Sequence, residues 1–233
     1  NTSWSRVKGG DAIGNILVAV EENFDFVNPS KHLPELLEAH KLLVNIEDEH
    51  WKRIKLNELQ ELILEVCGLY LEASSAVANA VPGSSVKINI EALNRSNITI
   101  SFNSVSLASE SYPQDKLRLD NNEKKSLVLD LKIPEDQPYT SPYWLAEKGS
   151  LGMYNVNQPE LIGSPETTRP FHAEFELEFN GYTMKISKPV IHRYSRPDKG
   201  ELYVPFEIIP EATARFNDKV WIFADDSPRK IPD

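Results

Sequence analysis

The five histidines are the side chains of this sequence best suited to hold a metal ion. They are His32, His40, His50, His172 and His192. No two of them are three or four residues apart, which is the spacing that would place two imidazoles on one face of a helix. The acidic run at 47–49 beside His50 is typical of a solvated helix start, where acids favour the positive end of the helix dipole. We therefore predict no metal ligand and no catalytic residue in this chain.

Cys67 is the one cysteine, so no intrachain disulfide can form. It lies on the apolar stripe of a predicted helix, and Glu65 and Glu72 would oppose a thiolate. We expect a buried thiol that packs as a small hydrophobic group. The sequence has no phosphate-binding loop and no nucleophile elbow.

Aromatic rings in a proline-rich segment, residues 134–170, are the one positive signal for binding. They are Tyr139, Tyr143, Trp144 and Tyr154. Such rings can stack on a sugar or anchor a protein partner. The alternative is that they are buried against the chain's own sheet. The sequence leaves both interpretations open.

Charge and hydropathy exclude several classes of partner. The 233 residues include 25 Lys and Arg against 35 Asp and Glu, a formal net charge of −10. Without a basic stripe, we expect no nucleic-acid partner and no attraction to anionic membranes. No run of about 18 apolar residues is present, so we expect no membrane insertion. Because the chain starts at Asn1 without a signal-like stretch, we expect a fragment or a processed product.

Helical periodicity dominates residues 1–80. Apolar residues recur at helical spacing over 11–23 and from about 33 to 44. The longest predicted helix runs over 49–79 and contains Gly68 in its interior. These segments predict an N-terminal helical subdomain.

A period of two replaces the helical period after Gly83. Strands are predicted over 86–90, 98–102, 126–131 and 171–179, and Asn180-Gly181 is a strong hairpin signal. These features predict an α+β chain by segments, with an antiparallel immunoglobulin-like β-sandwich over 83–210. Residues 134–170 are an insertion with a weak strand near 161–162. Residues 211–233 are a linker or the start of a further β-module, with a strand candidate at 220–224.

Several segments together resemble the non-catalytic C-terminal region of large LmbE-like (PIG-L type) deacetylases of bacteria. The segments are residues 4–10, 24–26, 68–73, 81–83, 133–139, 142–145, 189–190 and 193–194. They are packing and turn signatures. The family's His-Pro-Asp-Asp and His-x-x-His motifs are missing, and residues 196–199 keep only the central Pro-Asp.

The resemblance implies a parent enzyme that removes acetyl groups from N-acetylglucosamine-type glycans with zinc. Zinc hydrolysis needs about three protein ligands beside an open position, so zinc is implied only for a catalytic domain outside this chain. The resemblance also implies a periplasmic or extracellular location, and it implies the catalytic domain of the parent enzyme as a partner.

Three functions remain open at this point. The first is an accessory segment of such a deacetylase, serving domain packing or substrate presentation. The second is an autonomous carbohydrate-binding module that uses the loop aromatics. The third is an independent hydrolase whose acids the spacing does not select.

Overall fold

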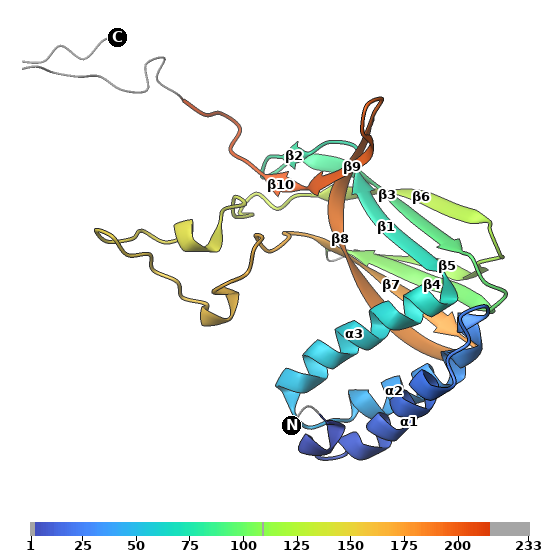
Figure 1. The fold of residues 1–233 in the computed structure, drawn as a ribbon. Helices are drawn as coiled ribbons and strands as arrows, with labels where there is room; N and C mark the ends of the chain where they lie inside the picture. Colours follow the sequence, from blue (N-terminus) through green and yellow to red (C-terminus); the bar gives the residue numbers. More distant parts are fainter. Residues whose placement is uncertain (1–2, 109, 215–233) are drawn as a thin grey trace, which may run out of the picture.

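The computed structural model describes residues 3–108 and 110–214, and it places the helices at one end of a curled sheet (Figure 1). The helices are α1 (Gly10–Glu22), α2 (Leu33–Val44) and α3 (Glu49–Cys67), with short 3₁₀ turns at Trp4–Arg6 (η1) and Pro29–His32 (η2). Their apolar stripes converge on fully buried residues such as Ile13, Leu36 and Ile63. The predicted helices over 11–23 and 33–44 are confirmed.

The predicted helix over 49–79 is wrong in its second half. α3 ends at Cys67, Gly68 caps it with a left-handed backbone (φ +56°), and β1 begins at Leu69. The helical stripe continues through 69–73 in the sequence, but these residues pair with β3 instead. Tertiary pairing overrides local propensity here, so the helical part ends at residue 67, and residues 69–75 and 79–80 form strands.

The rest of the described chain is built on one eight-stranded sheet. Its strands are β1 (Leu69–Ser75), β3 (Ser85–Asn94), β4 (Ile100–Leu107), β5 (Glu110–Arg118), β6 (Lys124–Lys132), β7 (His172–Phe179), β8 (Tyr182–Arg196) and β9 (Gly200–Pro205). They follow the order β5-β4-β7-β8-β1-β3-β6, with β9 paired to β8. Two short strands, β2 (Asn79–Ala80) and β10 (Glu207–Ile208), form a second sheet.

The prediction of an antiparallel immunoglobulin-like sandwich is therefore wrong. β1 pairs with β8 in parallel, and so does β10 with β2. β8 is 15 residues long and pairs with β7 at one end and with β1 and β9 at the other, so it joins both halves into one curled mixed sheet. Alternation of apolar and polar residues within a strand predicts which face of the strand is buried. It does not predict which other strands pair with a long strand such as β8.

Local strand patterns are confirmed where one face is buried. Phe171, Phe175 and Phe179 are buried, whereas His172 and Glu174 between them are exposed. Asn180 and Gly181 both have positive φ in the β7–β8 turn, as the hairpin signal requires. The predicted weak strand near 161–162 is absent from the described residues, which form a 3₁₀ turn, η4 (Pro159–Leu161), there instead. The candidate at 220–224 lies outside the described residues.

Polar contacts hold the helices against the β7–β8 end of the sheet. His40 Nδ1 is 3.0 Å from the Tyr182 hydroxyl, and Gln60 donates to the Lys185 carbonyl at 3.2 Å. Lys188 and Glu61 form an ion pair at 2.8 Å. Buried apolar residues of the helices and of the sheet belong to one continuous core.

Candidate functional site

The proline-rich segment between β6 and β7 encloses a cavity of about 500 Å³. Tyr139 and Tyr143, two of the four predicted aromatic residues, line it. Amides and hydroxyls make up half of the other lining residues: Gln137, Thr140, Ser141, Asn157, Gln158, Thr167 and Thr168. Apolar groups also line the cavity: Pro138, Ala146, Val156, Leu161 and Pro170. Glu147 and Arg169 add one charge of each sign. The cavity thus combines ring faces with many neutral hydrogen-bonding groups.

The structure only partly brings the four aromatic residues together. Trp144 meets Tyr143 edge to face, with ring centroids 4.9 Å apart, but it does not line the cavity. Tyr154 lies elsewhere on the segment and is 65% exposed. Tyr139 is 56% exposed, so neither ring is buried against the sheet.

Specific hydrogen bonds fix the walls of this cavity. The Thr140 hydroxyl accepts from the Ile208 N–H at 2.9 Å, and the Thr140 N–H donates to the Ile208 carbonyl at 2.8 Å. The Tyr143 hydroxyl accepts from the Gly163 N–H at 3.0 Å. The start of the segment is therefore bonded to β10. The bond from Gly163 to Tyr143 joins the two 3₁₀ turns of the segment, η3 (Tyr143–Leu145) and η4. This second bond helps to preorganise the ring of Tyr143.

A second polar cluster, the Arg193 cluster, lies on the β1–β3–β8–β9 part of the sheet. Arg193 on β8 is 3.0 Å from Glu72 on β1 and 3.4 Å from Glu91 on β3. Glu72 and Glu91 occupy directly paired positions, and both are more than nine-tenths buried. The Tyr70 hydroxyl donates to Glu72, and Lys124 donates to Glu91 at 3.1 Å.

The surroundings of Glu91 favour its carboxylate form over that of a general acid. A general acid needs a raised carboxyl pKa. Burial alone would raise the pKa of Glu91, but hydrogen bonds from Asn89, Lys124 and Arg193 lower it below its ordinary value. Burial would lower the pKa of Arg193, but the charge of Glu72 and the bond to Glu91 raise it above its ordinary value. Arg193 and Lys124 therefore supply two positive charges for the two carboxylates, and the guanidinium ties three strands together.

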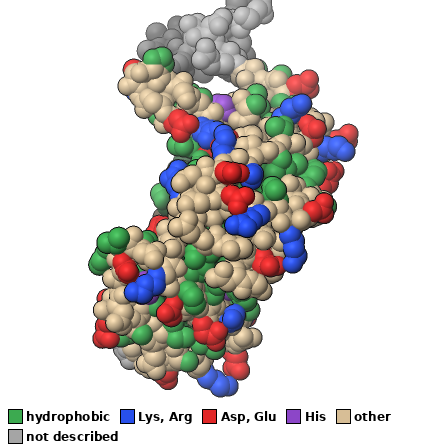
Figure 2. Space-filling view, turned by 90° about the vertical axis from the view of Figure 1, so that its right-hand side faces the viewer, with side chains coloured by type: hydrophobic (Ala, Val, Ile, Leu, Met, Phe, Trp, Pro, Cys, Tyr) green, Lys and Arg blue, Asp and Glu red, His purple; other side chains and the backbone are tan. Residues whose placement is uncertain are grey.

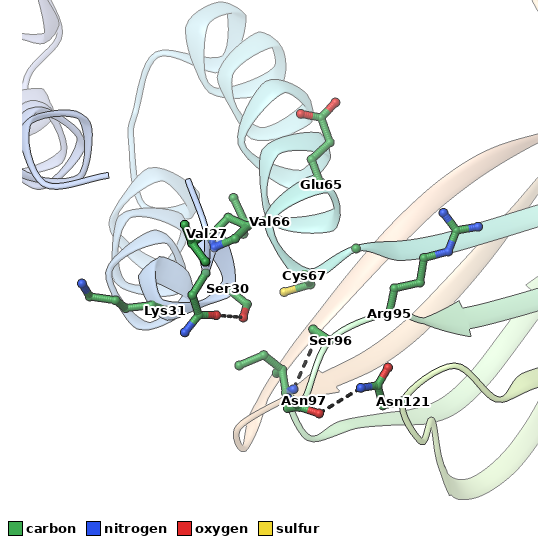
Figure 3. Close-up of a pocket in the computed structure, with 14 residues that line it drawn as sticks. Val27, Ser30, Lys31, Glu65, Val66, Cys67, Arg95, Ser96, Asn97 and Asn121 are labelled. Carbon is green, nitrogen blue, oxygen red and sulfur yellow. Dashed lines mark hydrogen bonds between the residues drawn. The ribbon is translucent and has the colours of Figure 1, made fainter. Parts of the chain in front are cut away.

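Cys67 is fully buried, at the end of α3 beside a cavity of about 450 Å³ (Figure 3). Burial raises the pKa of its thiol to about 12. The prediction that Cys67 packs as a buried, small hydrophobic group is confirmed by its burial. The neighbouring loop is held by the Asn121 amide, which donates to Asn97 at 2.9 Å.

Three of the five histidines, His32, His40 and His192, and the acidic run have hydrogen-bond partners. The Asp48 side chain accepts from the Trp51 N–H at 3.1 Å, so the run at 47–49 is a helix cap as predicted. His32 accepts from the Asp25 N–H at 3.0 Å. Within residues 3–108 and 110–214, no group of three or more His, Cys, Asp or Glu side chains is placed to hold a metal ion.

Acidic and basic side chains are intermixed along the face of the molecule that Figure 2 shows, and no basic stripe crosses it. Ion pairs join neighbouring strands, as in the bond between Lys116 and Glu178 at 3.1 Å. None of the helices in the described part of the chain has the length and apolarity that crossing a bilayer requires.

Comparisons with known proteins leave the family open. No family model matches the chain, and no curated protein matches it. Among solved structures, it is similar to a Pseudomonas fluorescens alkylpurine DNA glycosylase, AlkC, bound to DNA containing an abasic site analogue. The identity is 6% and the TM-score 0.24, over 70% of this chain and 46% of that chain. This chain therefore spans less than half of that protein's length, and a likeness at this TM-score supports no inference about fold or function.

Sequence reasoning missed two features of these sites. The amide and hydroxyl groups of the cavity are scattered over more than 30 residues and come together only through the turns of the segment. The Arg193 cluster had a readable signal, because Glu72 stands within an apolar stretch and a buried acid requires a cationic partner.

Proposed function

We propose that this chain is a non-catalytic recognition unit that binds glycans in the cavity of residues 137–170. The observation that carries the proposal is the composition of the cavity wall. Tyr139 and Tyr143 supply ring faces, and three amides and four hydroxyls supply neutral donors and acceptors. Sugars present apolar C–H faces and rings of hydroxyls, which this combination matches.

The test is binding of the purified chain to a glycan array, compared with two variants. Tyr139→Ala and Tyr143→Ala remove the two lining rings, and each should weaken binding by about tenfold, the equivalent of about 1.4 kcal/mol. Phe26→Ala is the matched control, because this ring is 88% exposed and belongs to the helical end of the chain. It should leave binding unchanged.

Two results would contradict this function. One is the absence of binding to every glycan on the array. The other is binding that both tyrosine variants retain in full, since the cavity would then not be the site.

A second proposal keeps the resemblance to LmbE-like deacetylases. In it, the chain is an accessory segment of an exported parent enzyme, located in the periplasm or outside the cell. Exposed apolar groups of the helical end support a docking role, since Phe26 and the adjacent Val27 are almost fully exposed. The zinc chemistry would belong to a catalytic domain outside this chain.

Zinc content and deacetylase activity of the purified chain test this second proposal. We expect neither stoichiometric zinc nor release of acetate from N-acetylglucosamine oligomers. Tight, stoichiometric zinc together with turnover would contradict it, because the chain itself would then be the enzyme.

A further inference from the structure

β1 and β8 meet only at one end, so the sheet is split between them. The parallel ladder joins Ala73–Ser75 to residues 190–192 and goes no further. β1 continues back to Leu69 and β8 back to Tyr182, and the described residues contain no strand between these two stretches. Figure 1 shows α3 entering the sheet where the strands separate.

The register of the neighbouring ladders shows which backbone groups face this split. The Arg95 N–H donates to the Gly68 carbonyl and the Ala76 N–H to the Lys87 carbonyl, so even-numbered residues of β1 bond to β3. Successive residues of a strand point their N–H and C=O groups to opposite sides. The backbone groups of Leu69 and Leu71 therefore point toward β8.

The same argument applies on the β8 side. The Val190 N–H donates to the Phe171 carbonyl, so even-numbered residues of β8 bond to β7 and odd-numbered residues face the split. The Lys185 carbonyl faces the split and accepts a hydrogen bond from the Gln60 side chain. Ser187 faces it too, and the ladder to β1 stops at Pro189, which has no N–H to donate.

α3 closes the wide end of the split, where Gln60 and Glu61 contact Lys185 and Lys188, and the rest of the split borders two cavities. Two cavities, of about 360 and 250 Å³, lie along it and share Tyr70, Leu71 and Lys188 in their walls. The side chains of Leu69 and Leu71 are buried on the inner face, and Tyr70 and Glu72 carry polar groups on the other. We propose that this split binds a short extended peptide of a partner protein, which adds a strand between β1 and β8.

The chemistry of both edges supports this occupant. Strand edges offer alternating donors and acceptors at the spacing of an extended backbone, and peptide recognition by strand addition uses such edges. Because side chains alternate between faces, the peptide should carry apolar residues at every second position, next to Leu69 and Leu71, and polar residues between them.

The test uses a blocked Thr-Val-Thr-Val-Thr peptide and the intact, isotope-labelled chain in solution. We expect the amide resonances of Leu69, Leu71 and Ser187 to shift on titration. Ser187→Pro removes the N–H that faces the split and leaves the β7 ladder intact, so it should weaken binding by about tenfold, the equivalent of one net hydrogen bond. Ser187→Ala keeps the N–H and should bind as the unmodified chain does.

An independent arm keeps the test decisive if Ser187→Pro does not fold. The same peptide with N-methylated valines lacks donors at those positions and should not bind the unmodified chain. Equal binding of the N-methylated peptide, or no shift at the three amides, would overturn the proposal. So would a dimer of the free chain that Ser187→Pro dissociates, since the occupant would then be a second copy.

Discussion

Arg193 is the residue whose loss should matter most to stability. Replacing it with methionine in Arg193→Met keeps much of the side-chain volume but leaves Glu72 buried without its cation and Glu91 with Lys124 alone. Breaking a buried ion pair by removing one partner costs about 3–5 kcal/mol. Urea unfolding should show a loss of this size.

Arg196→Met is the matched control for Arg193→Met. Arg196 is on the same strand, is about half exposed and pairs with Asp198 at 3.7 Å. Exposed pairs contribute at most about 1 kcal/mol, so this variant should unfold near the unmodified chain. Equal losses in both variants would contradict the assigned role of Arg193.

The lowered pKa of Glu91 predicts a dependence of stability on pH. A carboxylate whose pKa is lower in the folded than in the unfolded chain stabilises the fold at pH values above its ordinary pKa of 4.5. This contribution is lost as the pH falls below 4.5 toward the folded-state pKa. The free energy of unfolding should therefore fall less steeply with acidification in Glu91→Gln than in the unmodified chain. Identical slopes in urea titrations over this range would refute the prediction.

The junction of α3 and β1 is the element on which the prediction from sequence failed. Apolar residues at 69–73 continue the helical period, so the sequence pattern predicts a helix that runs through Gly68. The deciding contact is the pairing of β1 with β3, whose partner residues lie 13 to 25 positions further along the chain, and a local pattern contains no such contact. The left-handed Gly68, by contrast, was a readable helix stop.

Gly68→Ala tests this junction. The backbone of Gly68 is left-handed, and an added Cβ would lie 3.1 Å from the Cβ of Arg95. We expect a loss of about 1–2 kcal/mol in unfolding free energy from the backbone alone, with crowding added. Gly200→Ala is the control, since its φ is also positive (+73°) but nothing lies within 4 Å of the added Cβ. A smaller loss at Gly68 than at Gly200 would contradict the description of this junction.

At the scale of the whole molecule, the sequence is sufficient to predict local features such as strands, turns and helix caps. It is insufficient to predict the pairing of strands that are distant in the chain. The alternation in β7, the Asn180-Gly181 turn and the cap at Asp48 follow from spacing alone. The curled mixed sheet does not, because it depends on one strand, β8, pairing in parallel with β1 from the opposite half of the chain. For the same reason only two of the four predicted aromatic residues line one cavity.

The helices and the sheet should unfold together. They share one apolar core and are linked by contacts such as that of His40 with Tyr182. Thermal unfolding followed by circular dichroism and by intrinsic fluorescence should give coincident transitions. Two separated transitions would show that the helical part folds independently.

The most direct test of glycan recognition is nuclear magnetic resonance titration of the isotope-labelled chain with a soluble N-acetylglucosamine oligomer. We predict shifts confined to residues 137–170, including Tyr139, Tyr143 and Gln158, and saturating with a single dissociation constant. No shift at millimolar sugar, or shifts centred on the helices instead, would contradict it.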